Sequence, residues 1–174
     1  MRELKAIYVI VSGSSSARMI PDLLQRLPRF DLPIYTILTD NAPLVISPYN
    51  LVDQAGHTLI DSYFDPVMVD ERQPGLTIVA PATFNTLNKL SQGIADTLAH
   101  SLAAEAIGAG WPVIVAPSMN QALFNHPRVA QSIDILRAWG VTVLQPELTD
   151  DLLMMASVEN IIDAAEARLA ELSP

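Results

Sequence analysis

Short apolar runs rich in β-branched residues alternate along this chain with longer stretches of helical periodicity. Ala6–Val11 is a continuous apolar run, as expected for a parallel strand that is covered on both faces. The other expected strands are Pro33–Leu38, Leu76–Ala80, Val113–Ala116 and Val141–Leu144. Strands that alternate with helices favour an α/β fold, a doubly wound parallel sheet of Rossmann-like or flavodoxin-like type.

The expected helices lie between these runs. In Met19–Leu27 the apolar residues recur on one helical face, and Thr58–Ser62 is expected to be extended. The other expected helices are Leu51–Ala55, Asn85–Gly93, Asp96–Ile107, Pro127–Trp139 and Val158–Leu172. No internal repeat or low-complexity linker interrupts this order, so residues 1–174 are expected to form a single domain.

Composition excludes several classes of function. The chain has 19 acidic and 10 basic residues, a formal charge of −9, which argues against nucleic acid as a partner. No apolar run is long enough to span a membrane, and no signal peptide is recognisable, so a cytoplasmic protein is expected. Cysteine is absent and the three histidines are widely spaced, so no metal site is expected.

One segment combines a strand, a polar turn and a helix start. Pro81 is expected to end the strand that begins at Leu76, because proline has no N–H for the ladder. Thr83, Asn85 and Thr86 then place hydroxyl and amide groups beyond the strand's carboxyl end. In open parallel sheets this is the edge at which ligands bind.

A second polar loop, Ser12–Ser16, follows the first strand and leads into a helix. Its amides and hydroxyls, with the glycine at position 13, suit a phosphate, but an ordinary capped turn explains the same residues equally well. The loop has neither a complete dinucleotide fingerprint nor a Walker sequence, which argues against NAD and ATP.

Two blocks of this sequence resemble the flavoprotein family that includes phosphopantothenoylcysteine decarboxylase and the peptidyl-cysteine decarboxylases of lantibiotic biosynthesis. The first block is Ala80-Pro81, Asn85-Thr86, Lys89 and Gly93–Asp96, and the second is the Pro-x-Met-Asn motif Pro117–Asn120. The resemblance extends from about Lys5 to about Gln145.

The resemblance implies an FMN site and assigns its residues. It makes Gly13, Ser14 and Ser15 ligands of the FMN phosphate, with Thr39 as a further hydroxyl that holds the flavin. The segment that contacts the flavin and its ribityl chain is Thr83, Phe84, Asn85 and Thr86, and Ser118 and Met119 lie beside it. Asn120 matches the residue that binds the substrate carboxylate in decarboxylating relatives.

Structural roles compete with some of these assignments. Thr83 or Asn85 is also a suitable N-cap for the helix that contains Leu87, and Asn120 for a short helix over Ala122–Phe124. Phe84 is also a candidate for core packing.

The sequence departs from the decarboxylases at two points. Those relatives carry a histidine upstream of the Ala-Pro strand, and the corresponding segment of this chain, Asp65–Arg72, has none. His57, Asp70 and Glu71 are the candidates to replace that histidine. The coenzyme A pathway enzyme also uses a cysteine in a substrate clamp, and this chain has no cysteine.

The function expected from this resemblance is that of a divergent FMN-dependent enzyme, a decarboxylase or oxidoreductase acting on a small carboxylated or thiol substrate or on a peptide. The alternative is a non-catalytic FMN-binding or regulatory protein. A prenyl-flavin synthase is the least favoured, because the loops offer few cationic residues beyond Arg18, Lys89 and Arg128. The resemblance also implies a homo-oligomer, a trimer or a multiple of trimers, with FMN between subunits.

Overall fold

A six-stranded parallel sheet forms the centre of the molecule in the computed structural model, which describes residues 4–48, 51, 56–69, 73–149 and 152–171. The strand order is β3-β2-β1-β4-β5-β7. These strands span Ala6–Val11 (β1), Ile34–Leu38 (β2), His57–Ile60 (β3), Gly75–Ala82 (β4), Val113–Pro117 (β5) and Thr142–Val143 (β7). The chain moves outward from β1 to β3 on one side and then from β4 to β7 on the other, which confirms the doubly wound α/β fold.

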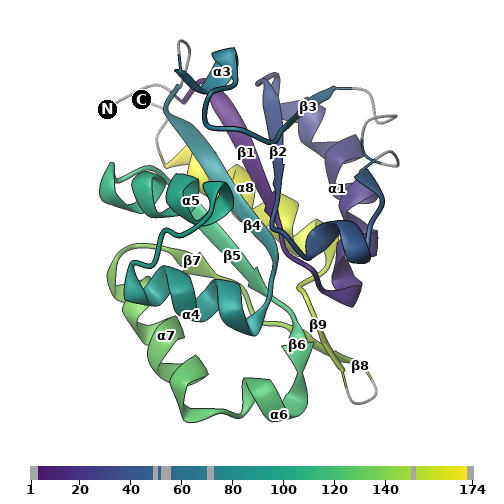
Figure 1. The fold of residues 1–174 in the computed structure, drawn as a ribbon, viewed down its shortest axis with the longest axis vertical. Helices are drawn as coiled ribbons and strands as arrows, with labels where there is room; N and C mark the ends of the chain where they lie inside the picture. The colour runs from purple at the N-terminus through teal and green to yellow at the C-terminus, as the bar shows by residue number, and fades with distance from the viewer. Residues whose placement is uncertain (1–3, 49–50, 52–55, 70–72, 150–151, 172–174) are drawn as a thin grey trace.

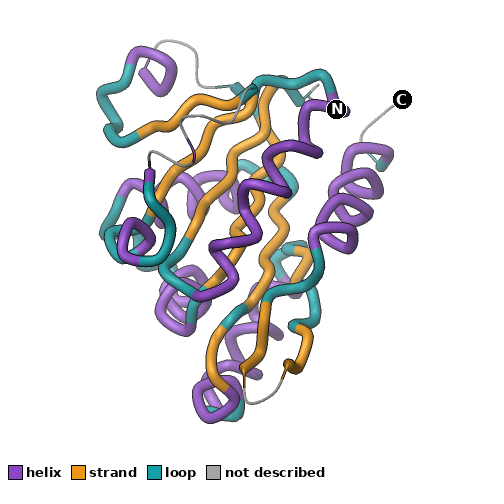
Figure 2. The backbone as a smooth tube through the Cα atoms, turned by 90° about the vertical axis from the view of Figure 1, so that its right-hand side faces the viewer, coloured by secondary structure: helices purple, strands orange, loops and turns teal. Residues whose placement is uncertain are grey.

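Helices cover both faces of this sheet (Figures 1 and 2). One face packs against α1 (Ile20–Arg26) and α8 (Val158–Ala170), and the other against α4 (Phe84–Gln92), α5 (Leu98–Gly108) and α7 (Pro127–Ala138). Shorter helical pieces are η1 (Ser15–Met19), η2 (Leu27–Phe30), η3 (Ala42–Leu44), α3 (Pro66–Val69) and α6 (Gln121–Phe124).

The alternation of side chains along β1 explains why its sequence is apolar throughout. Ile7, Val9 and Val11 pack into the core with α1 and α8, whereas Tyr8 and Ile10 pack into the core on the opposite face. Successive side chains of a strand point to opposite faces, so a strand covered on both sides has no position for an exposed polar residue.

A small antiparallel sheet lies near the carboxyl ends of the central strands, with β6, β8 and β9 below β5 in Figure 1. It consists of β6 (Met119–Asn120), β9 (Leu152–Met154) and β8 (Glu147–Thr149), in that order. Met119 pairs with Leu153, and Asn120 pairs with Leu152. A late segment of the chain is thereby attached to the loop that follows β5.

Pro81 does not end its strand, so that prediction was wrong. The strand β4 continues to Ala82, which pairs with Pro117, and the pairing with β5 changes register between Val79 and Ala82. A register irregularity tolerates a residue without an N–H, and the Pro81 carbonyl accepts a 3.2 Å hydrogen bond from the Ser12 amide.

Other expected boundaries differ by short distances. The helix expected over Met19–Leu27 is α1, Ile20–Arg26, because Met19 ends η1 and Leu27 begins η2. Thr97 caps α5, so this helix begins after Asp96, and β3 begins at His57 instead of Thr58. Apart from Leu51, the expected helix over Leu51–Ala55 lies outside the described residues, as does Leu172.

Candidate functional site

A pocket of about 390 Å³ lies at the carboxyl edge of the sheet, over the point where the strand order reverses between β1 and β4. The loops after three strands meet there: Gly13–Ser15 after β1, Thr83–Asn85 after β4 and Ser118–Asn120 after β5. Leu123 of α6 and two residues of β9, Leu152 and Leu153, complete the lining. The pocket therefore has a polar floor formed by loops and an apolar wall formed by α6 and β9.

Gly13 allows the first two loops to touch. A Cβ atom at this position would lie 2.6 Å from the carbonyl oxygen of Asn41 and 2.9 Å from the Asn41 Cβ. Backbone at Asn41 cannot yield as a flexible side chain does, so only glycine fits without a shift of one loop. The glycine brings the turn after β1 directly against the turn after β2.

Hydroxyl groups connect the first loop to the loop after β5. Ser118 is 2% exposed, and its Oγ lies 2.6 Å from Ser14 Oγ and 2.8 Å from Ser16 Oγ. Ser16 Oγ also accepts a 3.0 Å hydrogen bond from the Met155 amide and lies 3.6 Å from Met154 Sδ. These contacts join the β1 loop, the β5 loop and the segment at β9 into one unit, which orients Ser14 toward the pocket's edge.

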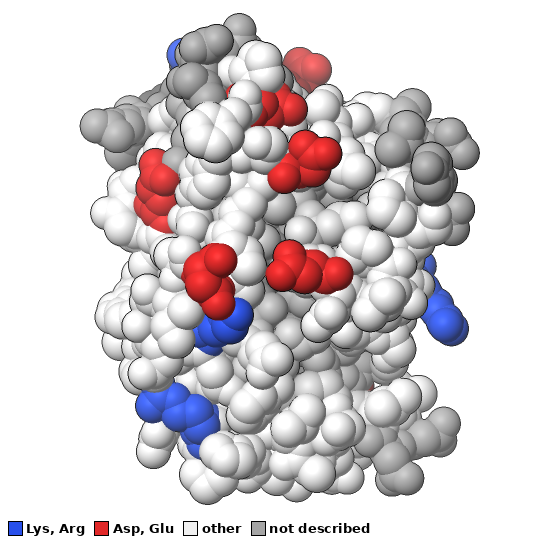
Figure 3. All heavy atoms as spheres, in the orientation of Figure 1, with Lys and Arg blue, Asp and Glu red and all other residues white. Residues whose placement is uncertain are grey.

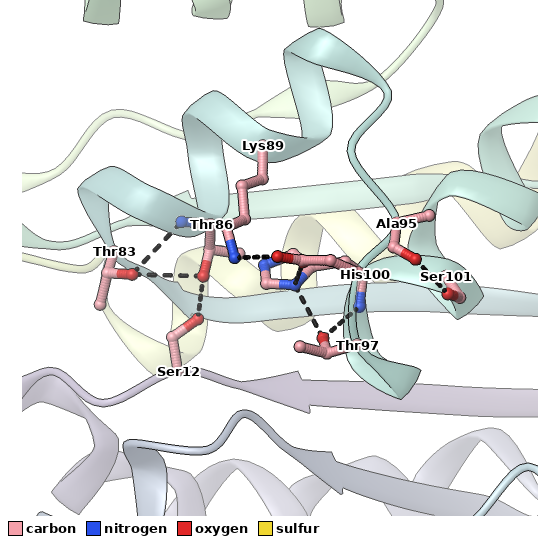
Figure 4. A network of polar contacts seen from close by, with 9 residues as sticks. Ser12, Thr83, Thr86, Lys89, Ala95, Thr97, His100 and Ser101 are labelled. Carbon is pink, nitrogen blue, oxygen red and sulfur yellow. Dashed lines mark hydrogen bonds and ion pairs between the residues drawn. The ribbon is translucent and has the colours of Figure 1, made fainter.

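Thr83 acts as the N-cap of α4. Its Oγ1 accepts a 3.4 Å hydrogen bond from the Thr86 amide, as one of the two sequence alternatives predicted. Thr86 is buried, and its Oγ1 lies 2.8 Å from Ser12 Oγ and 3.2 Å from Thr83 Oγ1 (Figure 4). The helix start is therefore tied to the end of β1.

Phe84 lines the pocket and also packs against the core on the α4 face, so core packing, one of its two predicted roles, is confirmed. The imidazole of His126 lies edge-on to it, with ring centroids 5.5 Å apart. An aromatic surface is thus fixed at the pocket wall by packing on its other side.

Asn120 is the N-cap of α6, so this structural alternative is confirmed. Its Oδ1 accepts a 2.8 Å hydrogen bond from the Leu123 amide. This bond fixes the side-chain amide and uses its acceptor, whereas Nδ2 has no hydrogen-bond partner among the described residues. The cap therefore leaves an oriented N–H donor at the pocket, which suits a carboxylate oxygen of a ligand.

A second pocket of about 210 Å³ adjoins the first, because Gly13, Thr83 and Asn85 line both. Its lining is polar and comes from the turn after β2, from α4 and from the start of α5. The remaining lining residues are Thr39, Asp40, Asn41, Thr86, Lys89, Thr97 and His100.

Two ionisable residues of this second pocket, Lys89 and His100, interact with the neighbouring Asp96 (Figure 4). Lys89 Nζ lies 2.7 Å from Asp96 Oδ2, and this hydrogen bond lowers the pKa of Asp96. His100 is 5% exposed, and its Nδ1 lies 2.8 Å from Thr97 Oγ1 and 3.4 Å from Asp96 Oδ1. Burial lowers the pKa of His100, as does the charge of Lys89, while the carboxylates of Asp96 and Asp40 oppose this shift.

The structure gathers nearly all the predicted site residues at one edge of the sheet. Asn120 and the ten residues predicted to contact the flavin line the two adjoining pockets: Gly13, Ser14, Ser15, Thr39, Thr83, Phe84, Asn85, Thr86, Ser118 and Met119.

The structure does not bring His57 to this edge, the one exception among those predictions. His57 is the first residue of β3 and pairs with Ile34, at the amino end of the parallel strands. Its Nδ1 lies 3.0 Å from Thr36 Oγ1. Its Nε2 is within hydrogen-bonding distance of the Leu51 carbonyl. The other two substitutes considered, Asp70 and Glu71, lie outside the described residues.

Sequence reasoning missed two parts of the site. Leu152 and Leu153 follow an acidic stretch that carries no ligand motif, and pairing of β9 with β6 alone brings them to the pocket. His100 lies in an apolar helix whose sequence gives no sign that its imidazole is buried beside Lys89. The available signal was the spacing of Thr97 and His100, because a side chain three residues after an N-cap threonine can contact that threonine.

The charge distribution agrees with the acidic composition. On the face in Figure 3, acidic side chains spread over the upper half while the basic ones are separate groups. Within the described residues, no cluster of histidine and carboxylate groups is arranged to hold a metal ion, and no helix has the length and apolar character of a membrane span.

Comparison with known proteins identifies the family. The model of the family described as Flavoprotein matches residues 1–170. This chain belongs to the flavoprotein family. The mouse phosphopantothenoylcysteine decarboxylase is 30% identical over 182 residues, which cover 95% of this chain and 87% of the mouse protein.

Other relatives of this flavoprotein are longer. The coenzyme A biosynthesis bifunctional protein CoaBC of Thermococcus kodakarensis is 29% identical over 164 residues, which cover 91% of this chain. The chain spans 40% of that protein's length.

Among solved structures, the FMN-dependent cysteine decarboxylase TvaF from thioviridamide biosynthesis superimposes with a TM-score of 0.75 at 26% identity, covering 95% of this chain and 98% of TvaF. The flavoprotein is thus of the cysteine-decarboxylase-like kind.

Proposed function

We propose that this flavoprotein binds FMN at the carboxyl edge of its sheet and uses it to oxidise a substrate that carries a carboxylate. The observation that carries the proposal is the meeting of three strand-end loops at one pocket, with the apolar wall of α6 and β9 beside them. TvaF, whose fold the chain shares, is described as FMN-dependent.

The residues present suit the parts of FMN. Gly13, Ser14 and Ser15 lie at the start of a helical turn and suit a phosphate. Their backbone amides and the two serine hydroxyls are hydrogen-bond donors, and their side chains are small. Phe84, Met119 and Leu153 offer flat or deformable apolar surface for the isoalloxazine ring. When bound, the flavin would supply an acceptor for a hydride, that is, for two electrons together with one proton.

The chain's own groups position the substrate. Asn120 Nδ2 binds one carboxylate oxygen while its Oδ1 stays with the Leu123 amide, so the donor is held in place before the substrate arrives. Leu123 and Leu152 are 38% and 46% exposed, and they cover apolar parts of the substrate beside that carboxylate. A small carboxylated thiol or the carboxyl-terminal cysteine of a peptide has this combination of groups.

The reaction of this chain diverges from that of its relatives in the proton-handling residues. The segment Asp65–Arg72 lacks a histidine and the chain has no cysteine, so the clamp chemistry of phosphopantothenoylcysteine decarboxylation has no residue to perform it. The alternative function, favoured by the same two departures, is a non-catalytic FMN-binding or regulatory protein.

Assembly and location form part of the proposal. A trimer or a multiple of trimers in the cytoplasm, each subunit a single domain over residues 1–174, would place apolar side chains such as Leu148 (61% exposed) and Phe64 (87% exposed) within reach of subunit interfaces.

The experiment is anaerobic mixing of the FMN-loaded protein with cysteine, with a peptide ending in cysteine and with 4′-phosphopantothenoylcysteine, following flavin absorbance and released carbon dioxide. Bleaching of the flavin together with carbon dioxide from one substrate supports the enzyme. Retention of oxidised flavin with all three, in a protein that binds FMN tightly, supports the non-catalytic alternative. Asn120→Asp is the matched variant, since it keeps the cap acceptor and removes the donor.

A further inference from the structure

His100 is a buried imidazole with one unused nitrogen. The side chain is 5% exposed, and its Nε2 has no hydrogen-bond partner within the described residues. Its other nitrogen, Nδ1, faces Thr97 and Asp96. A buried polar atom without a partner costs free energy unless a ligand satisfies it, so Nε2 is a feature that calls for a partner.

The surroundings of His100 define the chemistry of that partner. His100 lines the polar pocket with Lys89, Thr86 and Thr39, and this pocket adjoins the larger one, since Gly13 and Asn85 line both. Figure 4 shows the imidazole between Thr97 on one side and the side chains of Thr86 and Lys89 on the other. A cation and two hydroxyls beside an imidazole suit an anionic oxygen ligand, in contrast to the leucine-lined wall of the larger pocket.

We propose that His100 is a ligand of the cofactor phosphate, binding it through Nε2 as an imidazolium. This inference rests on the proposed FMN site and adds a residue to it. The larger pocket would hold the flavin ring, and the phosphate would be bound beside Gly13, which lines both pockets.

The charges around His100 explain why a proton accompanies the phosphate. Lys89 of α4 is already paired with Asp96, and Asp40 after β2 adds a further carboxylate to the lining. With a neutral imidazole, these groups leave the pocket unfavourable for an anion. Burial and Lys89 keep the pKa of His100 low in the FMN-free protein, and the arrival of a phosphate opposes both effects. Binding of FMN therefore takes up a proton at His100.

The test compares FMN with riboflavin, which has no phosphate, on the flavin-free protein between about pH 5.5 and 8.5, following quenching of flavin fluorescence. In the wild type, we expect the preference for FMN over riboflavin to increase as the pH falls toward 6. In His100→Gln, which keeps a neutral amide near Nε2, FMN affinity at pH 6 falls by about tenfold and riboflavin affinity stays within about twofold.

Ionisation of the FMN phosphate itself changes FMN affinity with pH in the opposite direction to protonation of His100, so the direction of the pH dependence distinguishes the two effects. The second pKa of the phosphate is about 6, so deprotonation alone would strengthen FMN binding as the pH rises. His100→Gln is expected to show only this rise, and His57→Gln, at the other edge of the sheet, is expected to behave as wild type. Nuclear magnetic resonance of His100 in the wild type is an independent readout, with its pKa expected to rise when FMN binds.

The outcomes separate this inference from the proposed function. Unchanged FMN affinity in His100→Gln together with an unchanged His100 pKa on binding overturns the inference while leaving the FMN site intact. If His100→Gln does not fold, the resonance titration of the wild type decides alone. A protein that binds neither flavin at any pH contradicts the proposed function and this inference with it.

Discussion

Ser14 Oγ lies 2.6 Å from Ser118 Oγ, although 104 residues separate the two serines in sequence. The contact joins the loop after β1 to the loop after β5 across the reversal point of the sheet, with β4 between them. Ser118 is buried and its Oγ also lies 2.8 Å from Ser16 Oγ, so it holds both Ser14 and the first turn of η1. Ser118 therefore lines the pocket and also positions the first loop at its edge.

Ser118→Ala is expected to lower the free energy of unfolding by about 1–2 kcal/mol, because Ser14 and Ser16 lose a buried partner. It is also expected to weaken FMN binding, since the first loop is less firmly held. Chemical denaturation and fluorescence titration measure the two effects. The matched control is Ser101→Ala, whose hydroxyl bonds to the Ala95 carbonyl in a more exposed position. Equal effects of the two changes would argue against a buried network at Ser118.

Gly13→Ala is expected to destabilise the fold by about 1–3 kcal/mol, because the added Cβ would lie 2.6 Å from the Asn41 carbonyl oxygen. The displacement of either turn also opens the site, so FMN binding is expected to fall. Gly108→Ala is the control, since a Cβ there meets nothing within 4 Å. Thermal unfolding that is alike in both variants would contradict the close approach of the two turns.

Asn120→Asp is expected to lower kcat/KM for a carboxylated substrate by about 100-fold, which corresponds to the loss of about 3 kcal/mol of binding to the carboxylate. The aspartate keeps the acceptor for the Leu123 amide, so α6 and FMN binding are expected to persist. Asn120→Ala removes the cap as well and is expected to cost about 1 kcal/mol of stability in addition. Unaltered kinetics in Asn120→Asp would remove Asn120 from the substrate site.

His100 gives the FMN-free protein a specific dependence on pH. Burial holds the pKa of His100 below its ordinary value of 6.5, so the unfolded chain binds this proton more tightly than the folded one. The free energy of unfolding is therefore expected to fall as the pH falls below about 6.5, and to fall less in His100→Gln. Urea denaturation of both proteins at several pH values measures this. A steeper loss in His100→Gln would contradict a buried, neutral imidazole.

Lys89→Met is expected to raise the pKa of Asp96 toward its ordinary value, because the hydrogen bond from Lys89 is the main cause of its low value. It is also expected to raise the pKa of His100, since one source of positive charge beside the imidazole is removed. Titration of both side chains by nuclear magnetic resonance tests the pair. Movement of the His100 pKa in the opposite direction would show that Lys89 does not act on it electrostatically.

Much of the site could be predicted from the resemblance to the family and from the position of its residues after strands. A parallel sheet brings the carboxyl ends of its strands to one edge, and Ser14, Thr83 and Ser118 lie together because β1, β4 and β5 are neighbours in that sheet. Pro81 was misjudged because a register irregularity, which has no sequence signature, removes the need for its N–H.

The apolar wall could not be predicted from sequence. Leu152–Met154 is a short strand that pairs with the neighbouring Glu147–Thr149 and with a two-residue strand, Met119–Asn120, that is distant in the chain. The pairing of Leu152–Met154 with Met119–Asn120 depends on contacts between residues distant in sequence, because such short segments have little intrinsic preference for strand structure. The acidic residues around Leu152–Met154 are typical of an exposed surface.

The most direct test of the account is the absorbance spectrum of the purified protein between about 300 and 550 nm, with mass spectrometry of whatever small molecule denaturation releases. The account predicts oxidised flavin bands and FMN in the released fraction, or their appearance after addition of FMN, and predicts that Gly13→Ala weakens this binding. A colourless protein that also fails to bind added FMN would contradict the central claim, because the loops that meet at Gly13, Thr83 and Ser118 would then lack the cofactor for which they are assigned.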